Sequence, residues 1–205
     1  MQMLKATPRN LIKAAEIVRK GGLVVYPTDT VYGLGCDPFN TDAVKRLIRV
    51  KGTRDKALPI LASSLNDAEK VAVLSGQAKK VAEKFWPGSL TLILPKKKHL
   101  SSIVTFGLET VGIRVPNHRT ALELIRLSGG LLVGTSANKT RQPPPSTATE
   151  AKNQLEDEVD LILDGGKTEI GVSSTVIDFT LEEPNVMRVG SVSLEEIMEF
   201  LEKHV

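Results

Sequence analysis

The stretch GGLVVYPTDTVYGLG, residues 21–35, decides the fold, because a helix end, a buried strand and a polar loop follow one another in it. Its two leading glycines end a helical pattern over residues 10–20, for which Asn10 is the expected cap. Residues 23–27 are apolar and end at a proline, which predicts a buried strand. Hydrogen-bonding side chains follow at the strand end, where open α/β folds place ligands.

Two interpretations of this polar loop remain open. Asp29 and Thr30 either bond the local backbone and cap a turn, or face a ligand. Carboxylates and hydroxyls serve both purposes, so the loop alone does not separate the two.

Helical and strand patterns alternate along the chain, without a strong internal repeat or a Ser/Gly linker. Further helices are expected at 42–51, as two short helices within 66–86, and at 119–128, 148–155 and 193–204. Further strands are expected at 58–62, 89–95, 111–116, 131–135, 159–164 and 173–179. The alternation predicts a single α/β domain over residues 1–205 with a mixed sheet, a motif-bearing core over about 10–190 and a C-terminal helix over 193–204.

Helix caps are also visible in the sequence. Thr147 is placed to cap the helix at 148–155, and Ser193 with Glu196 forms a capping box for the last helix. These polar residues mark where the two helices begin.

The composition is that of an ordinary globular protein, with 205 residues, 41% hydrophobic and 25% charged. The single cysteine, Cys36, excludes an intramolecular disulfide and a cysteine-based zinc site, and it favours a reducing cytosol. The first ten residues are too polar for a signal peptide, and no apolar run is long enough to span a membrane. We therefore expect a cytoplasmic protein without membrane association.

Charge is distributed unevenly along the chain. Residues 1–149 hold 23 Lys and Arg against 10 Asp and Glu, a charge of +13, whereas residues 150–205 hold 4 against 14, a charge of −10. A basic body indicates an anionic ligand, although a solvated basic surface explains the same numbers.

Standard catalytic and nucleotide-binding signatures are missing. The sequence contains no G-x-x-x-x-G-K-[ST] and no G-x-G-x-x-G. The three histidines are scattered and fit no metal-ligand spacing, and no Ser-His-Asp or Cys-His arrangement can be identified. We expect no metal site built by the protein and no obligatory catalytic acid or base.

Three further polar clusters interrupt the apolar pattern. A basic helix ends at Lys51 and is followed by Arg54, which suits either the helix dipole or a polyphosphate clamp. GTSAN at 134–138 lets a backbone approach a ligand closely, and GVSSTVID at 171–178 adds hydroxyls upstream of Arg188. Each cluster also fits a plain turn or strand start. Together they indicate a cationic, hydroxyl-rich pocket that suits a small polar metabolite beside a nucleotide's phosphates.

Taken in order, these clusters resemble the YrdC-like threonylcarbamoyl-AMP synthase family. The resemblance runs from about Gly21 to Gly190 and rests on GGLVVYPTDTVYGLG, Lys51 with Arg54, FWPGSLTLIL, VGIRVPNH, TSAN, DGG and SSTVID…MRVG. It implies a YrdC-like fold, a twisted mixed sheet with helices around a deep, positively lined cleft, in the short form of the family. It also implies a nucleotidyltransferase that converts L-threonine, bicarbonate and ATP to threonylcarbamoyl-AMP and pyrophosphate, before a separate complex transfers the group to tRNA.

The resemblance also implies roles for individual residues. Those around L-threonine would be Thr30, Arg114, Gly134 and Ser174, with Arg114 on the carboxylate. Those around ATP would be Lys51, Arg54, Thr110, Ser136, Asn138, Pro144 and Arg188. Catalysis would consist of positioning and charge neutralisation, and magnesium would arrive with ATP.

The sequence departs from the family pattern at two places. The usual Lys-x-Arg is one residue wider in Lys51-Gly52-Thr53-Arg54, which leaves open which side chain contacts which phosphate. Many members also have a histidine in the following strand, whereas this strand reads LPILA (58–62), with Ile60 as the expected occupant of that position.

Two other functions remain open. The basic body also suits a divergent relative that binds double-stranded RNA or tRNA without synthase activity, although aromatic residues make up only 4% of the chain. A carbamoyl-transfer module like that of hydrogenase maturation proteins is a third possibility, against which the short chain and the absence of zinc-finger cysteines count.

Overall fold

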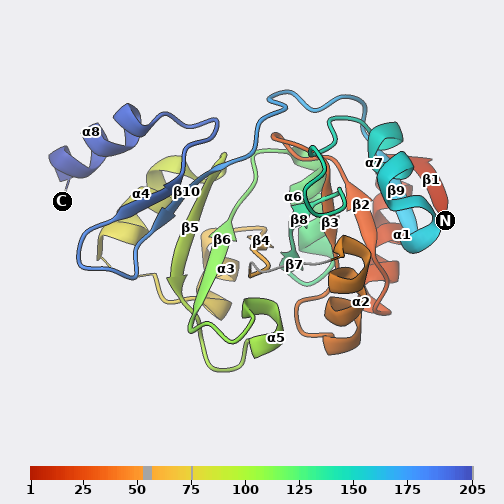
Figure 1. Cartoon of the computed structure of the whole chain (residues 1–205), viewed down its shortest axis with the longest axis horizontal. Helices are drawn as coiled ribbons and strands as arrows, with labels where there is room; N and C mark the ends of the chain where they lie inside the picture. Colours follow the sequence, from red (N-terminus) through yellow and green to blue (C-terminus); the bar gives the residue numbers. More distant parts are fainter. Residues whose placement is uncertain (53–56, 75, 205) are drawn as a thin grey trace.

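Two mixed β-sheets lie side by side in the structure, a computed structural model that describes residues 1–52, 57–74 and 76–204 (Figure 1). The five-stranded sheet has the order β1 (Gln2–Lys5), β9 (Leu161–Asp164), β2 (Val24–Tyr26), β3 (Gly33–Gly35) and β8 (Thr135–Ser136). The six-stranded sheet has the order β11 (Asn185–Arg188), β10 (Thr175–Asp178), β5 (Leu90–Pro95), β6 (Thr110–Arg114), β4 (Ile60–Ala62) and β7 (Leu131–Val133). The α/β class expected from the sequence is confirmed.

The sequence suggested one mixed sheet, and the division into two has a local cause at Gly134. The single strand expected over 131–135 is split there, so that β7 pairs with β4 in one sheet and β8 pairs with β3 in the other. Gly134 donates its backbone N–H to the carbonyl of Pro59 at 2.8 Å. A Cβ at position 134 would lie 2.2 Å from Cγ of Leu61, so only glycine lets the chain cross between the sheets at this distance.

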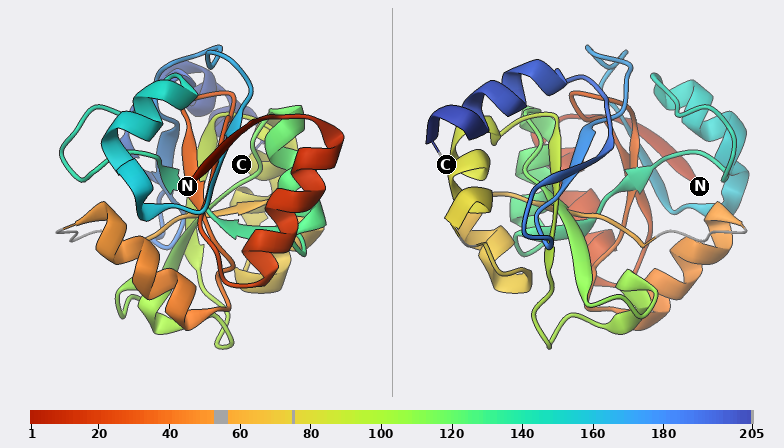
Figure 2. Two further views of the ribbon diagram at one scale, coloured as in Figure 1. Left: turned by 90° about the vertical axis from the view of Figure 1, so that its right-hand side faces the viewer. Right: turned by 60° about the vertical axis from the view of Figure 1, so that its left-hand side comes forward.

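The helices surround both sheets. They are α1 (Pro8–Arg19), α2 (Thr41–Lys51), α3 (Leu65–Val71), α4 (Gly76–Phe85), α5 (Ser102–Thr105), α6 (Arg119–Leu127), α7 (Ala148–Leu155) and α8 (Leu194–His204), with a 3-10 turn at Glu156–Glu158. Figure 2 shows α1 beside α6, and α8 over α4. The termini lie at opposite ends of the molecule (Figure 1). No helix in the described ranges combines the length and the apolar composition that a bilayer crossing requires.

Two apolar clusters hold these layers together. One joins α1 and α6 to β2 and β9, with Leu11, Val18, Leu124 and Leu161 among its buried side chains. The larger one joins the other helices to both sheets. Full burial of each large aliphatic side chain contributes about 1.5–3 kcal/mol, so these clusters supply the main driving force for the arrangement.

The helix starts follow local capping, with one correction. The cap of α1 is Thr7, not Asn10: Oγ1 of Thr7 accepts from the backbone N–H of Asn10 at 3.4 Å, and Pro8 begins the helix. The cap at Thr147 is confirmed as a full capping box with Glu150. At α8, Ser193 accepts from the backbone N–H of Glu196 at 3.1 Å, which is one half of the expected box.

Strand β3 was not expected, because GLG has little strand propensity. Its glycines are needed for a close approach: a Cβ on Gly35 would lie 2.7 Å from the carbonyl of Val133 and 2.9 Å from the ring of Tyr26. Two other strands that the sequence did not predict, β1 and β11, are at the sheet edges. Tertiary pairing therefore overrides local propensity in these segments.

Candidate functional site

A pocket of about 820 Å³ is lined by residues of both sheets. It brings together most of the side chains proposed from the sequence: Thr30, Thr110, Arg114, Gly134, Ser136, Ser174 and Arg188. These residues come from the loop after β2 and from β6, β8, β10 and β11, or lie directly beside those strands. The whole threonine group and three of the seven ATP candidates of the sequence analysis therefore share one cavity.

In the loop after β2, one residue of PTDT caps the local turn and another makes a contact with a distant segment. Thr28 caps the local turn: its Oγ1 donates to the carbonyl of Val31 at 2.7 Å and accepts from the backbone N–H of Thr30 at 3.2 Å. Asp29 instead reaches across to Arg114 on β6 of the other sheet. The turn is thus held by Thr28, which leaves the Asp29 carboxylate for a long-range contact.

Arg114 is fixed by three acceptors. Its Nε donates to the carbonyl of Gly88 at 2.8 Å, Nη1 donates to Oγ1 of Thr30 at 2.9 Å, and Nη2 donates to the carboxylate of Asp29. Asp29 also accepts from Oγ of Ser89 at 3.2 Å. A guanidinium has five N–H donors, so these bonds leave two for a ligand in the pocket.

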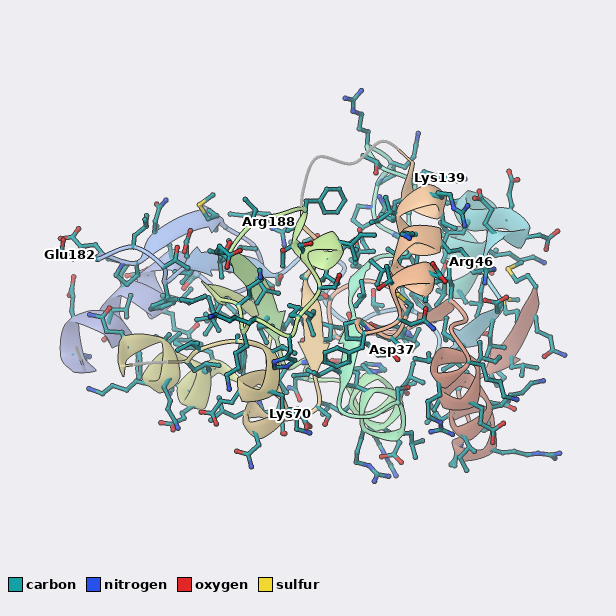
Figure 3. All side chains as sticks on the ribbon, turned by 90° about the horizontal axis from the view of Figure 1, so that it is seen from below. Asp37, Arg46, Lys70, Lys139, Glu182 and Arg188 are labelled. Atoms are coloured by element: carbon teal, nitrogen blue, oxygen red, sulfur yellow. The ribbon has the colours of Figure 1, made fainter. Side chains whose placement is uncertain are left out.

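A second guanidinium lies on the β11 side of the pocket. Arg188 donates from Nε and Nη2 to the carbonyl of Ser174 at 3.0 and 2.9 Å, and from Nη2 to the Ser174 hydroxyl at 3.2 Å. That hydroxyl also lies 2.9 Å from Oγ1 of Thr91. Figure 3 shows Arg188 near the middle of the molecule, with Arg46 and Lys139 on the α2 side.

The pocket has a positive lining. Arg114 and Arg188 line it, and no Asp or Glu does so among the described residues. Burial lowers the pKa of Arg114, while the nearby carboxylate of Asp29 opposes that shift, and burial also lowers the pKa of Arg188. An arginine starts from an ordinary pKa above 12, so both groups keep their charge at neutral pH. The pocket suits an anionic ligand.

Lys51 does not line the pocket, and its side chain bonds to backbone carbonyls instead. Its Nζ donates to the carbonyl oxygens of Ser136 and Asn138, both at 2.5 Å, and the residue is 2% exposed. The Asn138 amide in turn donates to the carbonyls of Lys139 and Gln142, both at 2.8 Å. Lys51 and Asn138 thus brace the TSAN loop from behind.

The two remaining ATP candidates are Pro144 and Arg54. Pro144 is exposed and does not line the pocket, whereas its neighbour Pro145 is buried and accepts from the backbone N–H of Tyr32 at 2.9 Å. Arg54 lies outside the described residues. Direct contact of Lys51, Asn138 and Pro144 with ATP stays a prediction.

The strand position assigned to the family's histidine needs a correction. Ile60 is fully buried in the larger apolar cluster, whereas its neighbours Pro59 and Leu61 line the pocket. Successive side chains of a strand point to opposite faces, so Ile60 cannot face a ligand there. Leu61 does, and it is the cross-strand partner of Arg114.

Sequence reasoning left the role of Asp29 open between a turn cap and a ligand contact, and it gave no role to Tyr32. The hydroxyl of Tyr32 donates to the carbonyl of Gly166 at 2.6 Å and accepts from the backbone N–H of Gly165 at 3.1 Å, which ties the DGG segment to β3. Both residues stand in the PTDTVYG stretch, but their partners are more than 80 positions away, and no local signal indicates them.

The acidic, histidine and cysteine side chains give no metal-binding cluster. No group of three or more of these residues lies close enough to hold an ion within the described ranges.

Comparison with known proteins finds relatives that match most of the chain. The chain is 42% identical over 186 residues to the threonylcarbamoyl-AMP synthase of Pyrococcus abyssi, which covers 90% of this chain and 55% of that protein. It is 41% identical over 199 residues to the threonylcarbamoyl-AMP synthase of Bacillus subtilis, which covers 95% of this chain and 57% of that protein. The chain thus spans somewhat more than half the length of these two relatives.

A solved structure agrees. The P. abyssi Sua5 protein complexed with L-threonine matches with a TM-score of 0.92 and 39% identity, covering 97% of this chain and 59% of that one. The sequence model of the Sua5/YciO/YrdC family, described as "Telomere recombination", matches residues 16–190. With this match over most of its length, the chain belongs to the Sua5/YciO/YrdC family.

Proposed function

We propose that the protein forms threonylcarbamoyl-AMP from L-threonine, bicarbonate and ATP. The observation that carries the proposal is the pocket itself, in which the Arg114 cluster from one part of the cavity and the Arg188 cluster from another face the same space. The names of the two relatives and the threonine-bound Sua5 structure support the choice of substrates.

The threonine end of the pocket is the Arg114 side. The two N–H groups that Arg114 does not use on Thr30, Asp29 and Gly88 suit a carboxylate in a two-point contact. Gly134 leaves room beside Leu61, where any larger residue would collide. An amino acid anchored there by its carboxylate would have its amine available for reaction.

The reaction needs two steps at that amine. The nitrogen attacks the carbon of bicarbonate, which loses water and leaves a carbamate. A carbamate oxygen then attacks the α-phosphorus of ATP, and pyrophosphate leaves. The protein would hold the two reactants together and neutralise their charge, and the proton that the threonine ammonium loses before the nitrogen attacks would pass to solvent.

The phosphates would lie on the Arg188 side. Arg188 and Ser174 are joined there, and Thr110 and Ser136 add hydroxyls to the lining. We place magnesium with ATP, since the described side chains offer it no cage. In this scheme Lys51 acts on the nucleotide through the TSAN loop, because its ammonium is bonded to that loop's carbonyls.

The wider role follows from the product. A threonylcarbamoyl adenylate is an activated acyl donor, so we propose nucleotidyltransferase activity in tRNA modification, with a separate complex transferring the group to tRNA. The single cysteine, Cys36, fits a reducing cytoplasm as the place of this work.

The test is pyrophosphate release by the purified protein with ATP, magnesium, bicarbonate and L-threonine. Release should depend on threonine and on bicarbonate, and the adenylate should appear by mass spectrometry. Threonine-independent ATP turnover, or none, would refute the proposal. Salt-sensitive binding of double-stranded RNA that ATP and threonine leave unchanged, without turnover, would favour the RNA-binding alternative.

A further inference from the structure

Asp29 lies behind the pocket wall rather than in it. The residue is 3% exposed and is not among the residues that line the cavity. Its two carboxylate oxygens accept from Nη2 of Arg114 and from Oγ of Ser89. A carboxylate placed in this way makes no direct contact with a ligand and acts on it chiefly through Arg114.

The three bonds to Arg114 determine which way its guanidinium faces. Gly88 offers a neutral carbonyl and Thr30 a neutral hydroxyl, whereas Asp29 offers a carboxylate. Charge-assisted hydrogen bonds are roughly twice as strong as neutral ones, so Asp29 is the dominant constraint on the guanidinium plane.

Asp29 is itself held from a third segment of the chain. The backbone N–H of Ile170 donates to the carbonyl of Asp29 at 3.1 Å, and that of Gly171 donates to the carbonyl of Thr30 at 2.8 Å. Both donors belong to the connection between β9 and β10, which passes from one sheet to the other. The loop therefore presents Asp29 to Arg114 from a fixed position.

We propose that Asp29 is a positioning residue for the amino-acid substrate: it orients Arg114 so that the two unused N–H groups face the pocket. The inference rests on the proposed function, because it takes the substrate carboxylate as the partner of Arg114. Its effect should be confined to threonine, since Arg188 bonds to Ser174, whereas Asp29 bonds to Arg114 and Ser89.

Two effects of removing the Asp29 charge oppose each other. The loss of a nearby anion would by itself strengthen the attraction between Arg114 and a bound carboxylate. The loss of the oriented ion pair frees the guanidinium to turn away, and two-point recognition depends on that orientation. The loss of orientation dominates, because the Arg114 guanidinium must present two N–H donors to one substrate carboxylate at the same time.

The experiment measures the dissociation constants of L-threonine and of ATP by calorimetry, for the native protein and for Asp29→Asn. Asparagine has the size of aspartate but no charge. The threonine constant should rise about tenfold or more, the factor that goes with losing a charge-assisted bond, while the ATP constant stays within about twofold.

The matched control is Asp160→Asn. Asp160 accepts from both terminal nitrogens of Arg46, at 2.6 and 3.1 Å, and from the backbone N–H of Leu23 at 2.7 Å, but it does not line the pocket. Breaking this second Asp–Arg pair should lower stability and leave the threonine constant unchanged. A purely structural role for Asp29 would give the same pattern.

The outcomes separate the two hypotheses. A native protein that binds no threonine refutes the proposed function. If the native protein binds threonine, two results for Asp29→Asn overturn the positioning role. In one, the variant binds threonine equally or more tightly, and in the other, the variant loses affinity for threonine and ATP together. If Asp29→Asn does not fold, Ser89→Ala removes one hydrogen bond to the same carboxylate. A threonine constant raised about threefold then supports the role, and an unchanged one overturns it.

Discussion

Replacing Lys51 with methionine tests whether this lysine supports the TSAN loop from inside the protein. The ammonium is buried and donates to two backbone carbonyls, those of Ser136 and Asn138. Methionine has a similar length but no donor, so it fills the volume and leaves both carbonyls without this partner. The change therefore isolates the hydrogen bonds from the packing.

The magnitude follows from the Asn138 carbonyl, because the Ser136 carbonyl still accepts from the backbone N–H of Asn138 at 2.9 Å. A buried acceptor left without a partner costs about 1–3 kcal/mol. The native protein bears a desolvation cost for the buried ammonium, which methionine removes, so the net loss should fall in the lower half of this range. We expect a loss of about 1–2 kcal/mol in the free energy of unfolding, which corresponds to a fall of about 0.5–1 M in the urea midpoint.

The assay is urea unfolding followed by circular dichroism, with Lys45→Met as the control. Lys45 stands on the same helix, α2, but its side chain is 58% exposed and its ammonium lies 3.7 Å from Asp42. An exposed pair of this kind contributes little, so the control should unfold within about 0.5 kcal/mol of the native protein. If Lys51→Met unfolds at the same urea concentration as Lys45→Met, the bracing role is refuted.

Three further predictions concern the charged and buried groups. Arg114→Lys keeps the positive charge but loses the planar guanidinium that binds a carboxylate at two points. In steady-state assays the KM for threonine should rise about tenfold or more, while the KM for ATP changes less than about twofold. Equal changes in the two KM values would contradict this prediction. Burial raises the pKa of the Cys36 thiol to about 12, and the charge of Asp37 adds to the shift. A thiol reagent at pH 8 should therefore label Cys36 only after the protein unfolds. Fast labelling of the folded protein would contradict the burial of this thiol. Burial by itself would raise the pKa of Asp160, but hydrogen bonds from Arg46 and Leu23 outweigh burial, so the pKa in the folded protein is lowered. Asp160→Asn should therefore destabilise the protein at pH values above the unfolded pKa of about 3.9. The difference in stability from the native protein should vanish as pH falls through the lower folded pKa. Urea midpoints between pH 3 and pH 7 check this last prediction, and a difference that grows toward low pH would refute it.

Much of the fold could be read from short-range patterns. The strand over 23–27 and the helix over 42–51 appear within two residues of their expected bounds as β2 and α2. The cap at Thr147 was also visible, because it depends on residues three positions apart. The edge strand β11 was not, because it is mostly exposed and its alternation is weak.

For the site, the sequence predicted several of the residues that line the pocket but few of the contacts that these residues make. The motif order pointed to Arg114 and Ser174, and both line the pocket. It gave no sign that Asp29 holds Arg114, and it assigned the strand position beside the ligand to Ile60 rather than Leu61. A one-residue shift along a strand exchanges its two faces, so that error follows from register alone.

The sequence by itself determined most of the helices and the buried strands, the family and the residue types of a cationic pocket, because helix caps, apolar periodicity and motif order are properties of neighbouring residues. Only the tertiary structure decided that the strand at 131–135 divides at Gly134 between two sheets, and that Lys51 turns to the loop carbonyls. It likewise decided that Asp29 pairs with Arg114, 85 positions away. Such contacts depend on strand register and close approach between distant segments, which packing of the whole chain sets and no local pattern encodes.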